Sequence, residues 1–167
     1  DLVTFRQGDI HAVESEPRAY DAMLIECVLS IMPDKLEVLS HLSRLLKPGG
    51  RLGLTDVTLE GSLPNELDSL LARAGCVGGA VSLAEYEKLL VEAGFAVELV
   101  EAKREAAASF LHNLNVKLEA AGIAAAVGTL SLDSNILDEA RRLLGLARDL
   151  VRNGTLGYGL IVARNPA

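Results

Sequence analysis

The stretch IECVLSIMPDK (residues 25–35) decides the fold, because it joins a buried strand to a helix. The strand is the apolar run at residues 20–26, which has the length typical of buried strands. Pro33 suits the first turn of a helix, and leucines at helical spacing give residues 33–47 an apolar face. Cys27 therefore lies at a strand-to-helix junction, where open α/β sheets bind their ligands.

The alternation of strand and helix continues on both sides of this stretch. Further strands are predicted at residues 3–6, 51–57, 95–100 and 156–164. Further helices are predicted from the SLAE capping box (82–85) to Gly94, at 103–121, and from Asp133 or Ser134 to Asn153–Gly154. KPGG (47–50) stops the first helix, and residues 58–81 are irregular and glycine-rich.

This pattern predicts an α/β fold with a mostly parallel sheet and helices on both faces. The last two strands are expected to pair antiparallel at an edge of the sheet. A chain of 167 residues suits one domain with a sizeable core.

Composition excludes several classes of function. The net charge of −7 disfavours nonspecific binding to nucleic acid or to an anionic membrane. No apolar run is long enough to span a bilayer, and two cysteines are too few for a disulfide scaffold. We therefore expect a cytoplasmic protein with reduced thiols. Because the chain lacks an initiator Met and begins almost at once with a strand, we expect it to be part of a longer polypeptide.

Three acidic residues lie at or just after the ends of predicted strands, and each has a simple structural explanation when taken alone. Asp9 suits a turn, Glu26 a solvated strand end, and Asp56 a loop cap. The three histidines have no metal-ligand spacing, so no metal site is predicted.

Taken together, these stretches resemble a known family. VTFRQGDI (3–10), YDAMLIECVLSIMPDK (20–35) and LSRLLKPGGRLGLTDV (42–57) resemble, in order and spacing, the second half of class I S-adenosylmethionine-dependent methyltransferases. The tail GYGLIVARNP (157–166) is similar to that family's last strand. The resemblance implies the C-terminal part of one Rossmann-like domain over residues 1–167, with a helical insertion at about 103–152. It also implies S-adenosyl-L-methionine as cofactor and a small-molecule substrate.

The resemblance carries the family's roles onto matching positions. Asp9 corresponds to the residue that accepts a hydrogen bond from the adenine amino group, and Ile10 to the neighbour whose backbone amide meets the adenine ring. Glu26 and Cys27 correspond to the strand end beside the methionine part of the cofactor. The next two residues, Val28 and Leu29, are expected to pack against that part.

A subgroup resemblance concerns the two cysteines. ECVLSIMPDK (26–35) and GCVGGAVSLAEYEKLLVEAGF (75–95) resemble arsenite methyltransferases, which hold trivalent arsenic through two thiolates. Here the pair would be Cys27 and Cys76, acting as catalytic residues on a metalloid substrate. Sulfur suits a soft, thiophilic centre. Two alternatives stay open: both cysteines are structural and the acceptor is carbon, nitrogen or oxygen, or they form a disulfide in an exported protein.

Parts of the family pattern are absent from the sequence. The glycine-rich cofactor loop and the ribose-binding acidic residue belong to strands that the family's sequences have ahead of this region. In the family's strand order, 3-2-1-4-5-7-6, the 3–6 strand would have no neighbour here, and the inner edge of the 20–26 strand would be bare. We expect preceding residues, direct pairing of 3–6 with 20–26, or a homodimer in which two chains complete each other's sheets. The alternative function is a truncated, non-catalytic module that acts by oligomerisation or partner binding.

Overall fold

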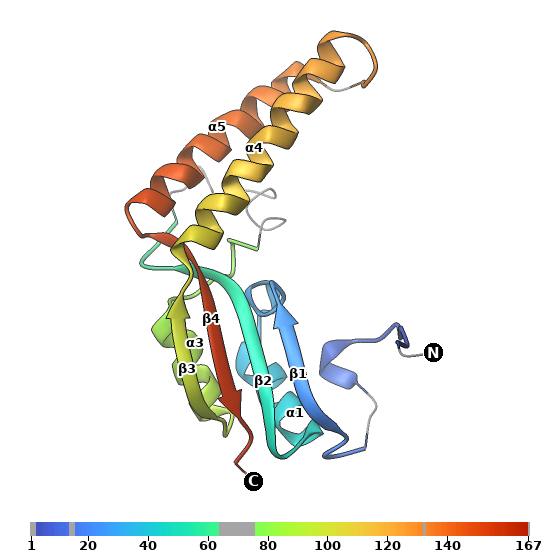
Figure 1. Cartoon of the computed structure of the whole chain (residues 1–167), viewed down its shortest axis with the longest axis vertical. Helices are drawn as coiled ribbons and strands as arrows, with labels where there is room; N and C mark the ends of the chain where they lie inside the picture. Colours follow the sequence, from blue (N-terminus) through green and yellow to red (C-terminus); the bar gives the residue numbers. More distant parts are fainter. Residues whose placement is uncertain (1–2, 14–15, 64–75, 132, 167) are drawn as a thin grey trace.

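The computed structural model describes residues 3–13, 16–63, 76–131 and 133–166. Its centre is a four-stranded sheet in the order β1-β2-β4-β3 (Figure 1). The strands are β1 (Tyr20–Glu26), β2 (Leu46–Leu59), β3 (Ala96–Ala102) and β4 (Leu156–Arg164). This order corresponds to the 4-5-7-6 part of the predicted arrangement, so an α/β fold is confirmed.

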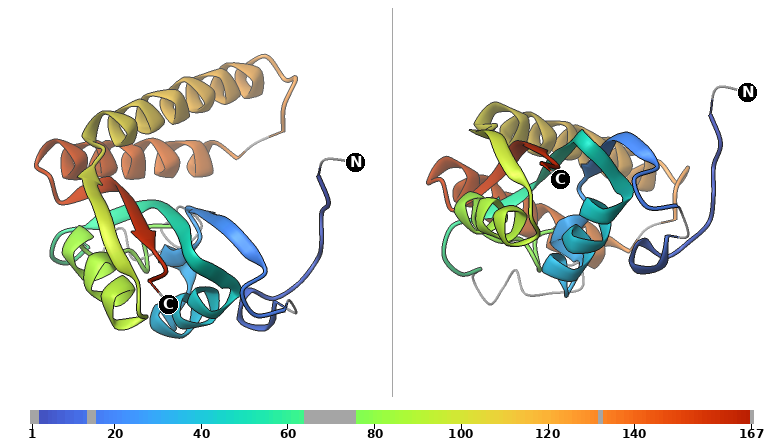
Figure 2. Two further views of the ribbon diagram at one scale, coloured as in Figure 1. Left: turned by 60° about the horizontal axis from the view of Figure 1, so that its bottom comes forward. Right: turned by 90° about the horizontal axis from the view of Figure 1, so that it is seen from below.

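The prediction of a mostly parallel sheet is wrong. Only β1 and β2 pair in parallel, whereas β4 pairs antiparallel with both β2 and β3. Two helices, α4 (Arg104–Ala126) and α5 (Ser134–Arg152), separate β3 from β4 and form a hairpin beyond one end of the sheet (Figures 1 and 2). A helical hairpin returns the chain to the end it left. β4 must therefore run back against β3, so the predicted antiparallel pairing of the last two strands at an edge of the sheet is confirmed, with β3 as the edge strand.

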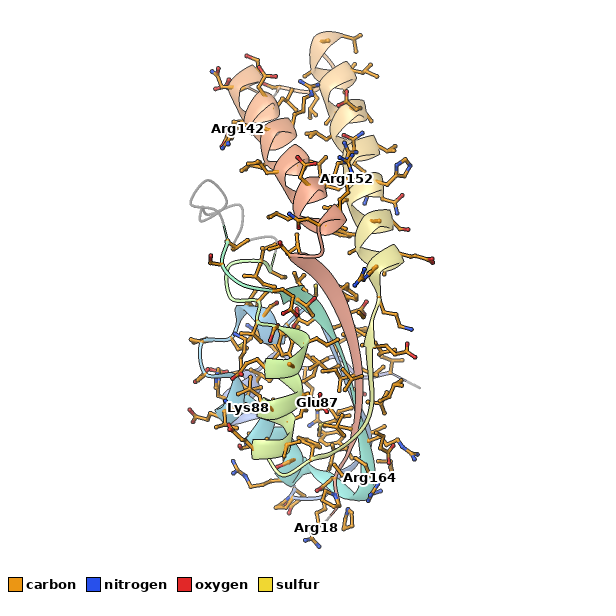
Figure 3. All side chains as sticks on the ribbon, turned by 90° about the vertical axis from the view of Figure 1, so that its left-hand side faces the viewer. Arg18, Glu87, Lys88, Arg142, Arg152 and Arg164 are labelled. Carbon is orange, nitrogen blue, oxygen red and sulfur yellow. The ribbon has the colours of Figure 1, made fainter. Side chains whose placement is uncertain are left out.

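The prediction of helices on both faces is also wrong for the described residues. The helices α1 (Lys35–Leu45) and α3 (Leu83–Glu92) lie on the same side of the sheet (Figure 3). The opposite face is open there, and the Leu24 side chain on it is 88% exposed.

The core lies between the sheet and the helices α1 and α3. Side chains alternate between the two faces of a strand, so Leu52 and Leu54 of β2 face the helices and are almost fully buried. Val38 and Leu39 of α1 meet them, and α3 contributes Leu90, which has no exposed surface. Burying one such leucine stabilises the fold by about 1.5–3 kcal/mol.

Local sequence signals set most element boundaries. The Ser82 hydroxyl accepts a hydrogen bond from the Glu85 amide at 3.1 Å, so the predicted cap of α3 is confirmed. The Asp133 carboxylate caps α5 in the same way. The first helix begins at Lys35, two residues later than predicted, because Met32 and Pro33 are still extended or turning. The KPGG segment is already part of β2, with a left-handed Gly49 at φ 79°.

The predicted strand at residues 3–6 does not form. The chain passes there without regular structure, and the Phe5 side chain is 94% exposed. Among the described residues, β2 is the only strand that pairs with β1, so pairing of 3–6 with 20–26 is excluded in this structure. Residues 64–75 of the predicted irregular segment lie outside the described residues. In the part of the chain that the structure describes, no helix has the length and apolarity needed to cross a bilayer.

Candidate functional site

Cys27 lies at the edge of the sheet where β1 and β2 both end. Its amide donates a hydrogen bond to the Thr55 carbonyl at 2.8 Å, which continues the β1–β2 ladder one residue beyond Glu26. The chain then turns sharply, and Cys27 takes a left-handed conformation with φ 53°. Non-glycine residues rarely adopt this region, and those that do cluster at functional sites.

Cys76 lies directly beside Cys27, although 49 positions separate them in the sequence. The Cys76 thiol donates a hydrogen bond to the Cys27 carbonyl at 3.4 Å, and Cys76 is also left-handed, with φ 63°. Both cysteines are free and half-buried. The fold therefore brings the two cysteines together, as expected from the sequence.

Two backbone contacts hold the Cys76 loop in place. Val81 forms a parallel bridge with Thr58 at the end of β2, and the Leu59 amide donates to the Val81 carbonyl at 3.0 Å. Gly79 crosses the turn after Cys27 so closely that a Cβ atom would lie 2.1 Å from the Ser30 carbonyl oxygen. Only glycine fits this crossing.

Asp56 is a buried acidic residue beneath the cysteines. It is 2% exposed, and its carboxylate accepts hydrogen bonds from the amides of Ser30 and Val57, both at 2.8 Å. Lys35 lies close to the same turn and donates to the Met32 carbonyl at 2.7 Å. Sequence reasoning treated Asp56 as a loop cap. The alternation in RLGLTDV was the available signal, because it puts Asp56 on the same face as Leu54.

The surroundings of Cys27 favour its protonated thiol. The pKa of Cys27 is raised to about 11, chiefly by burial and then by the nearby Cys76 thiol and Asp56 carboxylate. The Tyr158 hydroxyl contacts the Cys27 thiol and opposes this effect on the pKa. The same hydroxyl donates to the Thr55 hydroxyl at 3.2 Å. Sequence reasoning missed Tyr158, and no signal pointed to it, because only the sheet register brings β4 to this edge.

The predicted adenine side of the site lies in a short 3-10 turn, η1 (Ile10–Ala12), that packs against α1. The Asp9 Oδ1 atom is 2.8 Å from His11 Nδ1, and His11 Nε2 is 2.8 Å from Asp34 Oδ1. Hydrogen bonding to both carboxylates raises the pKa of His11 to about 8, and the pKa values of Asp9 and Asp34 are lowered in turn. The Asp9 side chain is 68% exposed, so part of its carboxylate is open to a ligand.

The remaining predicted cofactor residues differ in their access to solvent. Glu26 is exposed, and Ile10 and Val28 are half-buried, so all three are open to contact by a ligand. Leu29 is fully buried within the hydrophobic core. The Leu29 side chain points into the core and supports the turn from below, and its contact with the cofactor stays a prediction.

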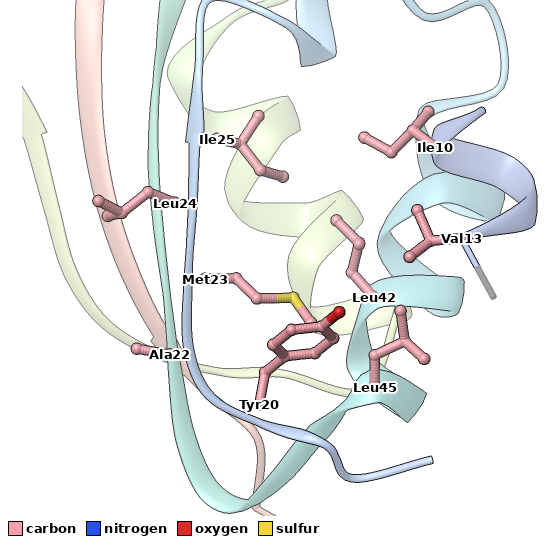
Figure 4. Close-up of a pocket in the computed structure, with 9 residues that line it drawn as sticks. All are labelled: Ile10, Val13, Tyr20, Ala22, Met23, Leu24, Ile25, Leu42 and Leu45. Atoms are coloured by element: carbon pink, nitrogen blue, oxygen red, sulfur yellow. The ribbon is translucent and has the colours of Figure 1, made fainter. Parts of the chain in front are cut away.

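An apolar groove runs along the open edge of β1. Its volume is about 320 Å³, and side chains from η1, β1 and α1 line it (Figure 4). Ile10 and Ile25 face each other across this groove. Within the described ranges, no group of three or more His, Cys, Asp or Glu side chains is arranged to hold a metal ion.

The geometry of this edge agrees with a comparison of protein families. A family model described as a methyltransferase domain matches residues 1–94, more than half of the chain. The chain belongs to the class I S-adenosylmethionine-dependent methyltransferases. The predicted recognition of this family is confirmed.

Curated relatives of this methyltransferase chain include two arsenite methyltransferases. The one from Halobacterium salinarum is 34% identical over 102 residues, which is 58% of this chain and 25% of that protein. The one from Aquipseudomonas alcaligenes is 38% identical over 98 residues, which is 56% of this chain and 28% of that protein. A 27-O-demethylrifamycin SV methyltransferase from Amycolatopsis mediterranei is 35% identical over 105 residues, which is 60% of this chain and 38% of that protein. The chain thus spans about a quarter of the length of the arsenite methyltransferases.

Solved structures show the same fold. A putative sarcosine dimethylglycine methyltransferase from Galdieria sulphuraria matches with a TM-score of 0.75 at 21% identity, covering 95% of this methyltransferase chain and 57% of that chain. Phosphoethanolamine N-methyltransferase 2 from Haemonchus contortus, in complex with S-adenosyl-L-methionine, matches with a TM-score of 0.74 at 18% identity, covering 95% and 36%. Both matches cover nearly the whole of this chain.

Proposed function

We propose that this chain takes part in methyl transfer from S-adenosylmethionine to trivalent arsenic held by Cys27 and Cys76. The observation that carries the proposal is the meeting of the two half-buried cysteines at the carboxyl edge of the sheet, with the Cys76 thiol 3.4 Å from the Cys27 carbonyl. The likeness to two arsenite methyltransferases supports arsenite as the substrate. The α/β edge at which the thiols lie is the usual place for a ligand in this class of fold.

Binding of arsenite needs no preformed thiolate. Each As–S bond replaces one As–OH bond, and the thiol proton leaves with the hydroxide as water. Two such exchanges join arsenic to Cys27 and Cys76 and release two water molecules. A raised pKa of about 11 at Cys27 is therefore compatible with binding at neutral pH. Once bound, arsenic keeps its lone pair, and the two thiolates orient it.

The described residues fit one side of the cofactor. When bound, S-adenosylmethionine supplies an electrophilic methyl group on its sulfonium centre. Asp9 carries an exposed carboxylate that suits an amino group of adenine, and Ile10 offers an apolar surface beside it. Glu26 presents a carboxylate at the end of β1, next to Cys27. These residues would bind and orient the cofactor, while the partial burial of the thiols limits the access of water to the acceptor.

A second candidate is methyl transfer to an organic acceptor, with both cysteines structural. The relative named 27-O-demethylrifamycin SV methyltransferase supports it, because its identity to this chain equals that of the arsenite methyltransferases within a few per cent. The two candidates differ in what they require of the thiols. Only the first predicts that arsenite and alkylating agents compete for them.

Arsenite protection of the thiols tests the proposal. The purified chain is treated with iodoacetamide with and without sodium arsenite, and alkylation is read by mass spectrometry. Trypsin releases Cys27 and Cys76 on separate peptides, 19–35 and 74–88, so each thiol is followed individually. We expect arsenite to slow alkylation of both cysteines together, because one arsenic atom binds both.

Single variants separate the pair from either thiol alone. Cys76→Ser is expected to remove protection at Cys27, and Cys27→Ser to remove it at Cys76. A distant variant, Ser109→Ala on the exposed surface of α4, is the control and keeps full protection. Protection that persists in either cysteine variant contradicts a two-thiol site. Transfer of labelled methyl from S-adenosylmethionine to arsenite, measured on the same variants, then tests the reaction itself, and failure to bind S-adenosylmethionine at all would favour the non-catalytic module.

A further inference from the structure

His11 is the one histidine that links two carboxylates from different elements among the described residues. Its Nδ1 atom is 2.8 Å from Asp9 Oδ1, and its Nε2 atom is 2.8 Å from Asp34 Oδ1. Asp34 is the residue just before α1. It lies between this helix and the turn that begins at Cys27. The imidazole therefore ties the predicted adenine segment to the element beside the predicted thiol site.

The protonation state of His11 decides whether this bridge is complete. A neutral imidazole has one N–H donor and one acceptor nitrogen, whereas the cation has two donors. A carboxylate only accepts, so both 2.8 Å contacts are hydrogen bonds only when both ring nitrogens carry hydrogen. A neutral ring faces one of the two carboxylates with a lone pair, and that contact is repulsive.

The charged groups around the bridge favour the cation. Asp9 lies on the same segment as His11, and its Oδ1 atom also accepts the His11 backbone amide at 3.0 Å. Asp34, just before α1, faces the ring. Within α1, Glu37 contacts Asp34, and the Lys35 ammonium is the opposing cation near Asp34. Hydrogen bonding to Asp34 and Asp9 is the main cause of a His11 pKa of about 8. At neutral pH the bridge is therefore formed.

We propose that His11, in its doubly protonated form, is the positioning residue that orients Asp9 for the adenine end of the cofactor. This inference rests on the proposed function, since it assigns a role within the same cofactor site. The hydrogen bond from His11 uses only the Oδ1 atom of Asp9, so the Oδ2 atom of this exposed carboxylate stays available to the ligand. Because the folded-state pKa of His11 lies above the ordinary value for histidine, the bridge is formed at neutral pH and is lost as the pH rises through about 8. Its contribution to stability is complete below about pH 6.5.

A histidine titration tests the bridge without any ligand. The ring C–H signals of His11 are followed by NMR between about pH 6 and pH 9, with the exposed His112 of α4 as the internal reference. We expect a midpoint near 8 for His11, and a lower midpoint in Asp34→Asn, where the amide can no longer stabilise the cation. A midpoint near the ordinary histidine value that Asp34→Asn leaves unchanged overturns the proposal.

Cofactor binding tests the role in positioning. Affinity for S-adenosylmethionine is measured by calorimetry over the same pH range in the wild type, His11→Gln and His11→Arg. Gln has one amide group that donates and cannot reproduce the bridge, so we expect affinity below pH 8 to fall roughly twofold to fivefold. Arg donates to both carboxylates at every pH, so His11→Arg should restore the affinity and remove the decline above pH 8.

The outcomes separate this inference from the proposed function. If the wild type binds no S-adenosylmethionine at any pH, the proposed function fails, and the role of His11 fails with it. If the wild type binds, but all three proteins share one affinity that does not vary with pH, only the role of His11 fails. If His11→Arg behaves like His11→Gln, the cationic bridge is likewise contradicted.

Discussion

Gly79 makes the closest backbone crossing at the site, and Gly79→Ala tests whether this crossing holds the two cysteines together. A Cβ atom at this position would lie 2.1 Å from the Ser30 carbonyl oxygen, whereas real Cβ atoms stay at least 3.0 Å away. The loop and the turn must therefore separate by roughly 1 Å, and the obstacle is backbone rather than a flexible side chain. Gly79 does not have a positive φ, so the effect is steric and not conformational.

The structure can accommodate the added methyl group in two ways, and a different measurement detects each of them. If small shifts absorb this separation and Cys76 stays beside Cys27, overpacking should lower the free energy of unfolding by about 1–3 kcal/mol, which in a chain of this length lowers Tm by about 2–12 °C. If the loop moves, Cys76 moves away from Cys27 and arsenite no longer protects both thiols. Thermal denaturation and the alkylation assay are therefore performed on the same protein.

Gly145→Ala is the matched control. Gly145 lies in α5, and an added Cβ atom there meets nothing within 4 Å. Alanine in a helix interior should stabilise the protein by about 0.5–1 kcal/mol and leave arsenite protection unchanged. The reasoning is refuted if Gly79→Ala matches the wild type in both Tm and protection.

Three further predictions concern groups around the thiols. Asp56→Ala leaves buried backbone amides without an acceptor and should lower the free energy of unfolding by about 2–4 kcal/mol in urea denaturation; a loss below about 0.5 kcal/mol would contradict its role. Cys27 should alkylate slowly at neutral pH, with a midpoint near 11 in its pH profile, and Cys76→Ser should lower that midpoint because a neighbouring thiol is one cause of the raised pKa. Tyr158→Phe should shift the midpoint upward, since its hydroxyl favours the thiolate; an equal change in rate at every pH would show that Tyr158 only shields the thiol.

The sequence predicted those parts of the fold that local chemistry controls. The Ser82 cap, the start of α5 and the strand at 156–164 were all correct, because each depends on neighbours within a few residues. The strand at 3–6 failed because a strand needs a partner, and no local property of that segment reports whether one is available.

The candidate site shows the same division. Cys27 and Cys76 were both identified from their sequence contexts, and so was the need for the fold to join them. The complete burial of Leu29 was not evident from the sequence, because the direction of its side chain depends on a 3-10 turn (η2, Leu29–Ile31) that the sequence did not reveal.

The sequence by itself determined the family, the order of strands and helices from residue 20 onward, and the two thiols that the proposed chemistry uses. Only the tertiary structure decided the antiparallel pairing of β4 with β2, the burial of Asp56 beneath the thiols, the approach of Tyr158 to Cys27 and the link between Asp9 and Asp34 through His11. The physical reason is the distance along the sequence over which each kind of interaction acts. Helix caps and apolar periodicity act over a few residues, whereas sheet register and the crossing of loops join residues that lie far apart in the sequence, such as His11 and Asp34, 23 positions apart, and Thr55 and Tyr158, 103 positions apart.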